Sequence, residues 1–146
     1  MYEIALWAHW AGLALSTFYI LRADHMGARW MLGKTETLDA SRVAYLHKGV
    51  WAGLGLLYIS GIFLILPIAS YIIEQQMFQA KMLFVLALTA NGYMIGKIDH
   101  IASTRSFASL SLHERFPLIL SGAISTICWI GSFVAGISLF PGWALW

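Results

Sequence analysis

Charged residues are scarce in this chain. Only 11% of its 146 residues are Asp, Glu, Lys or Arg, whereas 60% are hydrophobic. A soluble globular domain usually carries about a quarter charged residues. The shortage of charge excludes an ordinary soluble domain and indicates an integral membrane protein.

Cysteine is almost absent as well. Cys128 is the single cysteine, which excludes a disulfide within the chain. The sequence also lacks a C-x-x-C pair, an H-E-x-x-H motif and a phosphate-binding glycine loop, so hydrolase and nucleotide chemistry have no support. Its first residues contain no Lys or Arg and include Glu3, so we expect no cleaved signal peptide and a first apolar segment that stays as an anchor.

Four apolar segments are long enough to cross a bilayer, which takes about 20 residues of helix. They cover residues 4–21, 43–66, 77–98 and 116–140. Pro67 should end the second helix and Pro141-Gly142 the fourth, while Thr35 or Thr37 is a candidate start for the second. The sequence therefore predicts one all-α domain over residues 1–146, an antiparallel bundle of four transmembrane helices.

The basic residues indicate an orientation. Eight of the nine Lys and Arg residues lie in or beside the connections 22–42 and 99–115. Loops rich in Lys and Arg face the cytoplasm, so both termini should lie outside. We expect an integral protein of the bacterial inner (plasma) membrane, with an outer belt of tryptophans: Trp7, Trp10, Trp143 and Trp146.

Two ionisable residues lie inside the predicted spans. His9 shares a helix face with Ala5, Gly12 and Ser16, so it should face a neighbouring helix. Lys81 lies at a similar depth in the third span. Ionisable groups at such positions usually mark function. The alternatives are that His9 is only an interhelical hydrogen-bonding group and that Lys81 extends its ammonium to the outer interface.

The pattern predicts a haem b site. A helix bundle accommodates a flat macrocycle, with axial ligands from facing helices, and imidazole is a usual ligand. His9 would ligate the iron, and Lys81 would be the second ligand or would bind a propionate. In a variant of this prediction, His47 pairs with His100 or His113 to bind haem at the cytoplasmic end. His9 and His47 are the predicted metal-binding residues. Copper, which binds His and Met, is the alternative metal, and Met77 and Met82 lie on either side of Lys81 in the sequence.

The remaining four histidines lie near the ends of the predicted spans. His25 follows the first span, His47 opens the second, His100 closes the third and His113 opens the fourth. His25, His100 and His113 each have the alternative of an ordinary interfacial residue. Of the cytoplasmic histidines, His47 is the best placed for a ligand.

The motifs that contain His9 and Lys81 resemble a known family. AHWAGLALSTFYILR has its histidine early in the first span, and FQAKMLFVLAL has its lysine early in the third. The chain resembles the HemJ-type protoporphyrinogen oxidases and, more distantly, the CopD-like membrane domains. The resemblance implies that His9 and Lys81 take part in haem b binding and in oxidation of protoporphyrinogen. Gly12 and Arg22 are further points of resemblance, and Arg22 is included among the cofactor-binding residues.

Three classes of function follow. The first is a haem b redox protein, either similar to protoporphyrinogen oxidase or an electron carrier linked to quinone. The second is a proton or copper transporter or channel with a polar path through His9, Lys81, Asn91 and Asp99. The third is a structural subunit of a larger membrane complex. The expected partners are lipid, a quinone or a porphyrinogen, and a second copy or other membrane subunits, with no nucleic acid.

Overall fold

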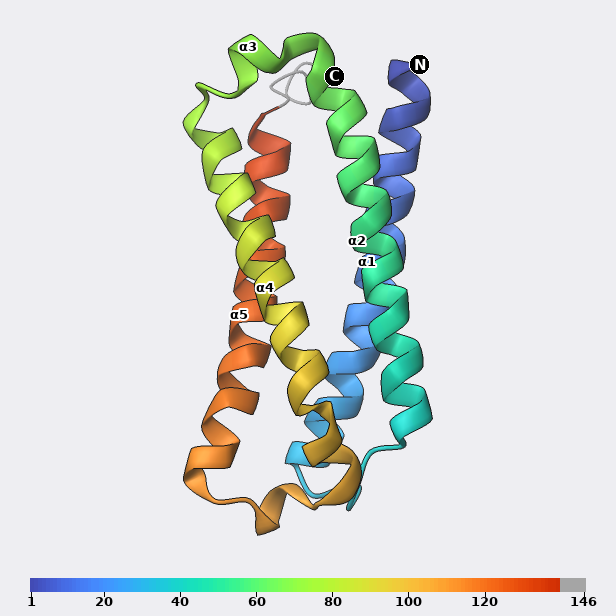
Figure 1. Cartoon of the computed structure of the whole chain (residues 1–146), viewed down its shortest axis with the longest axis vertical. Helices are drawn as coiled ribbons and strands as arrows, with labels where there is room; N and C mark the ends of the chain where they lie inside the picture. The colour runs from blue at the N-terminus through green and yellow to red at the C-terminus, as the bar shows by residue number, and fades with distance from the viewer. Residues whose placement is uncertain (140–146) are drawn as a thin grey trace. The chain divides into compact units, whose positions relative to one another are not determined.

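The computed structural model describes residues 1–139, apart from the side chains of residues 97 and 98. Four helices are long and apolar enough to cross a membrane: α1 (Tyr2–Met31), α2 (Ala40–Ile65), α4 (Gln76–Thr104) and α5 (Leu112–Ser138) (Figure 1). The shorter elements are η1 (Leu66–Ile68), α3 (Ala69–Ile72) and η2 (Phe107–Ser109). No strand occurs in residues 1–139, so the all-α prediction is confirmed. Pro141, Gly142, Trp143 and Trp146 lie outside the described residues.

Helix α1 is longer than its apolar segment. It continues past Leu21 to Met31, so the predicted connection from residue 22 is wrong, and His25 lies inside the helix. The segment after Leu21 becomes polar but contains good helix formers such as Ala, Arg and Met and no proline, and its internal glycine, Gly27, weakens a helix by only about 1 kcal/mol. Gly33 has a φ of 70°, a left-handed conformation that favours glycine, and it ends the helical path.

The start of α2 differs from the predicted one. Neither Thr35 nor Thr37 caps the helix; the N-cap is Asp39, whose carboxylate accepts hydrogen bonds from the backbone N–H groups of Ser41 (2.8 Å) and Arg42 (3.3 Å). Asp is among the best N-cap residues, and its charge also suits the positive end of the helix dipole. His47 therefore lies inside α2, well after the first residue Ala40. The predicted stop at Pro67 is confirmed, because α2 ends at Ile65.

The chain forms two compact units. The first comprises Met1–Pro67 and Ile98–Arg115; the second comprises Ile68–Lys97 and the chain from Phe116. The orientation in the membrane and the prediction of one domain are not tested by this division and stay predictions.

In the first unit, α1 and α2 run antiparallel and side by side (Figure 1). Their contact depends on glycines of α2: a Cβ at Gly53 would collide with Ser16, and a Cβ at Gly49 would collide with the ring of Tyr19. Small residues allow helix backbones to approach closely where lipid gives no hydrophobic drive for association. Gly49 and Gly53 are therefore part of the helix contact.

The first unit also contains the end of α4 and the segment up to Arg115. The buried Trp30, at the end of α1, donates its indole N–H to the backbone oxygens of Glu36 (3.2 Å) and Arg105 (3.1 Å). Its ring packs edge-to-face on Phe107, with 5.2 Å between ring centroids. The backbone N–H of Leu38 donates to Ala102 O at 2.8 Å. These contacts attach the segment 98–115 to the end of α1.

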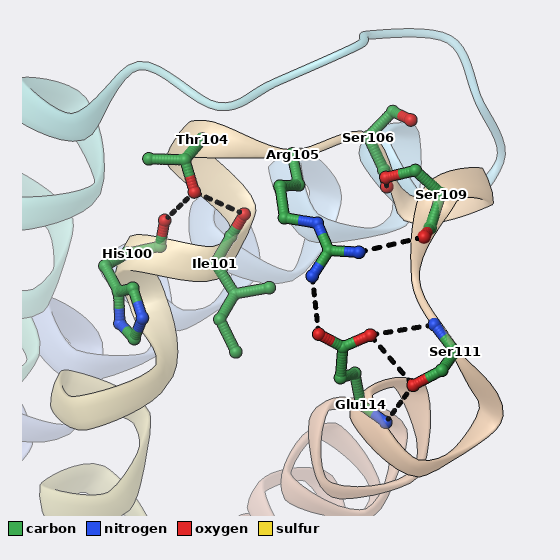
Figure 2. A network of polar contacts seen from close by, with 8 residues as sticks. All are labelled: His100, Ile101, Thr104, Arg105, Ser106, Ser109, Ser111 and Glu114. Atoms are coloured by element: carbon green, nitrogen blue, oxygen red, sulfur yellow. Dashed lines mark hydrogen bonds and ion pairs between the residues drawn. The ribbon is translucent and has the colours of Figure 1, made fainter.

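A polar network fixes the start of α5 (Figure 2). Ser111 and Glu114 form a capping box, in which Glu114 Oε2 accepts from Ser111 N (2.9 Å) and Glu114 N donates to Ser111 Oγ (3.4 Å). Arg105 pairs with the other carboxylate oxygen of Glu114 and also donates to Ser109 O at 2.9 Å. Side chains that precede and follow the turn before α5, Arg105 and Glu114, therefore fix its backbone.

In the second unit, α4 and α5 run antiparallel and side by side (Figure 1). Gly131 faces the ring of Phe84, where a Cβ would lie 2.7 Å from Cε2. The side chain of Asn91 donates from Nδ2 to Ser121 O at 2.9 Å. A glycine contact and a buried polar contact thus join the two helices.

Candidate functional site

His9 lies at the contact of α1 with α2. Its Nδ1 is 2.9 Å from Ser60 Oγ, and Ser60 is only 2% exposed. The Ser60 hydroxyl has one proton, which it donates to Leu56 O at 2.6 Å. With that proton used, Ser60 accepts at His9, and we assign the His9 imidazole proton to Nδ1.

This tautomer leaves the lone pair on Nε2. A histidine that binds a metal almost always donates its other ring N–H to a second residue, which fixes the tautomer and the ring orientation. The His9 ring is fixed in this way by Ser60. Gly61 also lies against the ring: a Cβ there would be 3.6 Å from His9 Cε1. The Nδ1–Cε1 edge of the imidazole thus faces α2.

The sequence prediction for this face is confirmed. Ala5, Gly12 and Ser16 are buried, and His9 makes a contact with the neighbouring helix. The hydrogen bond to Ser60 also agrees with the alternative prediction, in which His9 is an interhelical hydrogen-bonding residue. The two roles use different ring nitrogens, so the bond to Ser60 is compatible with a ligand role.

Lys81 is half-buried on α4, beside the last turn of α5. Its Nζ lies 3.2 Å from the position that a Cβ of Gly136 would take. The last carbonyl groups of a helix have no intrahelical partner and form the negative end of its dipole. Within residues 1–139, Lys81 forms no hydrogen bond or ion pair of its own. A lysine without an acidic partner, beside the C-terminal end of a helix, is placed to bind an anionic group such as a propionate.

His9 belongs to the first unit and Lys81 to the second. Each position is described within its own unit, and the predicted pairing of the two residues across one haem stays a prediction.

The other predicted ligands have different surroundings. His47 Nε2 accepts a hydrogen bond from the indole N–H of Trp51 at 2.6 Å, which occupies the lone pair that a metal would need. His113 is exposed near the start of α5, and the exposed His100 directs its ring away from Arg105 and Glu114 (Figure 2). Arg22 is also exposed, with its guanidinium 5.2 Å from the ring centroid of Phe18.

No group of three or more His, Cys, Asp or Glu side chains suited to a metal ion occurs in the described part of the chain. A haem with one or two axial ligands does not need such a group. The copper alternative gains no support from this result.

Ser60 is the residue that sequence reasoning missed. It lies in the run YISGIF, where it is the single hydroxyl apart from tyrosine. A lone serine in an apolar span is a usual interhelical hydrogen-bonding residue, and this signal could have identified it.

Comparison with protein-family models, with curated proteins and with solved structures finds no match. The resemblance to HemJ-type proteins is therefore neither strengthened nor weakened.

Proposed function

We propose that this chain is a haem b redox protein of a bacterial plasma membrane, with His9 as an axial ligand of the iron. The observation that carries the proposal is the chain of hydrogen bonds from His9 Nδ1 to Ser60 Oγ and from Ser60 Oγ to Leu56 O. With the proton on Nδ1, the lone pair of the imidazole lies on Nε2, and the bond to Ser60 fixes the orientation of the ring, as hydrogen bonds to the other nitrogen of a metal-binding histidine do.

Lys81 supplies the second element of the proposal. Its ammonium is held beside Gly136 without an anionic partner among residues 1–139, so a haem propionate is the group that we assign to it. Bound haem would provide one-electron chemistry at its iron. The resemblance to HemJ-type proteins favours a porphyrinogen as the compound oxidised.

The test is the absorption spectrum of the full chain, purified in detergent after expression with sufficient haem. We expect a Soret band in the wild type and its loss in His9→Ala. His25→Ala is the matched control, since His25 is an exposed histidine on the same helix, and it should keep the band.

Ser60→Ala separates ligation from simple packing. Loss of the hydroxyl that orients His9 should weaken haem binding by about ten- to a hundredfold, while the protein still inserts and folds. A colourless wild-type protein, or an unchanged spectrum in His9→Ala, would exclude the proposal.

A further inference from the structure

A pocket of about 90 Å³ lies between α4 and α5 in the second unit. Met94, Phe116, Leu120 and Ile124 form apolar walls, and Asn91 and Ser121 are the polar residues that line it. Both polar residues are only 4% exposed. The proposed haem site makes no use of this pocket.

Ser121 has an unsatisfied hydroxyl. Its Oγ is buried and forms no hydrogen bond within residues 1–139. Serine and threonine inside a helix usually donate to a carbonyl of the preceding turn, as Thr126 does to Gly122 O at 3.1 Å in the same helix. A buried hydroxyl without a partner is costly, and such a group calls for an explanation such as a bound acceptor.

Asn91 is held at the same pocket. One N–H of its amide donates to Ser121 O at 2.9 Å, which fixes the orientation of the side chain. A carboxamide has two N–H donors and an oxygen acceptor, and no further hydrogen bond of Asn91 is found in the described residues. Two polar groups with unused hydrogen-bonding capacity therefore meet in an apolar pocket.

The size of the pocket limits its ligand. An enclosed cavity of about 150 Å³ holds benzene, and one water takes about 30 Å³ of the liquid. At about 90 Å³ the pocket can receive one edge of a six-membered ring and cannot receive a haem. Its walls suit a flat apolar ring, and its unpaired hydroxyl donor suits a carbonyl oxygen on that ring.

We propose that this pocket binds the headgroup of a quinone, with the Ser121 hydroxyl donating to one quinone carbonyl oxygen. Asn91 positions this end of the ring, and Phe116 and Leu120 contact its face. The choice of a quinone among lipophilic carbonyl compounds rests on the proposed redox function. The prediction that the pocket binds a carbonyl oxygen does not depend on that function, because it follows from the unsatisfied hydroxyl of Ser121.

Duroquinone and durene provide the test. Both are flat six-membered carbon rings with four methyl groups, but durene is a benzene and has no carbonyl oxygen. Binding of each compound to the purified full chain is measured by equilibrium dialysis, with and without haem. Because a hydrogen bond inside a membrane protein is worth about 0.6–1.5 kcal/mol, we expect duroquinone to bind about three- to tenfold more tightly than durene.

Ser121→Ala should remove this preference. The substitution deletes an unsatisfied hydroxyl, so the thermal midpoint should be unchanged or higher. Ser125→Ala is the matched control, because Ser125 lies one turn further along α5 and does not line the pocket. The control should keep the full preference for duroquinone.

Equal binding of duroquinone and durene, or a preference that survives Ser121→Ala, would overturn the proposal. The two proposals can fail separately. A red protein that does not prefer duroquinone excludes the quinone site and leaves the haem site. A colourless protein that prefers duroquinone excludes the haem site and supports the pocket.

Discussion

A lysine inside a membrane-spanning helix needs a group that offsets the cost of its charge. Lys81 lies beside Gly136 in the last turn of α5, where helix carbonyls are without intrahelical partners. The negative end of the helix dipole stabilises a cation there by about 0.3–1 kcal/mol. Binding of a propionate would require the charged ammonium at this position, whereas direct ligation of iron would require the neutral amine.

Lys81→Arg tests this assignment. Arginine keeps the charge but does not ligate iron, so we expect Lys81→Arg to keep most of the haem and Lys81→Met to lose much of it. The measurement is the haem-to-protein ratio from the Soret absorbance of the purified variants. If Lys81→Arg loses haem as fully as Lys81→Met, then Lys81 is an iron ligand and not a propionate-binding residue.

Asp39 makes the stability of α2 depend on pH. Hydrogen bonds from the Ser41 side chain and from the backbone N–H groups of Arg42 and Ser41 lower the pKa of the Asp39 carboxyl below its usual value. A carboxyl with a lowered pKa in the folded state stabilises that state above the unfolded pKa, about pH 4. The contribution is lost as the pH falls through the lower pKa of the folded state.

We therefore expect the unfolding midpoint of the wild type to fall more steeply below about pH 4 than that of Asp39→Asn. Asparagine keeps an acceptor oxygen for the cap but does not titrate. Circular dichroism melts at several pH values measure the difference. Parallel pH profiles for the two proteins would show that the Asp39 carboxylate does not contribute.

The position of His9 could be predicted from sequence, whereas its partner could not. The spacing of Ala5, Gly12 and Ser16 determines which face of α1 carries the histidine. Which residue of α2 lies opposite depends on how far the two helices slide along each other. The close approach of Gly53 to Ser16 sets this register, and it follows from three-dimensional packing.

At the scale of helices, two glycines of α2 have opposite surroundings. A Cβ at Gly53 would lie 3.0 Å from the backbone N and 3.1 Å from the Cα of Ser16, atoms that cannot rotate away. A Cβ at Gly55 would meet nothing within 4 Å. The two positions form a matched pair on one helix.

Gly53→Ala should destabilise the α1–α2 pair by about 1–3 kcal/mol, as overpacking of a close contact does. Gly55→Ala should be neutral or should stabilise by up to about 1 kcal/mol, because alanine restricts the unfolded chain. Chemical denaturation in detergent, followed by circular dichroism, compares the two. Similar behaviour of both variants would mean that Gly53 is not at the helix contact.

The lengths of the helices were less predictable than their number. The four apolar segments are found as four long helices, because a span must be apolar and its backbone groups must be bonded internally. Apolarity ends at Leu21, but α1 continues to Met31 because helix propensity and the contacts of Trp30 do not require an apolar surface. The hydropathy pattern therefore indicates which part of each helix can lie in the bilayer, whereas the residues at which the helices end depend on caps and tertiary contacts.

At the scale of the whole molecule, the distribution of Lys and Arg predicts the orientation in the membrane. The connection between α1 and α2 should lie in the cytoplasm, and α3 should lie outside. Cys128, the single cysteine, is buried, so Cys128→Ala gives a cysteine-free chain into which reporters can be introduced. Thr37 and Ser70 are exposed and lie in these two connections.

We expect Ser70→Cys to react with a membrane-impermeant maleimide in intact cells and Thr37→Cys to react only after permeabilisation. The physical reason is that eight of the nine basic residues lie within residues 22–48 and 97–115, at the ends of the helices and in the connections between them, and positively charged segments of this kind stay in the cytoplasm. The cysteine-free chain gives the background labelling. The reverse pattern would invert the topology and move His9, with the haem site proposed for it, to the cytoplasmic side of the membrane.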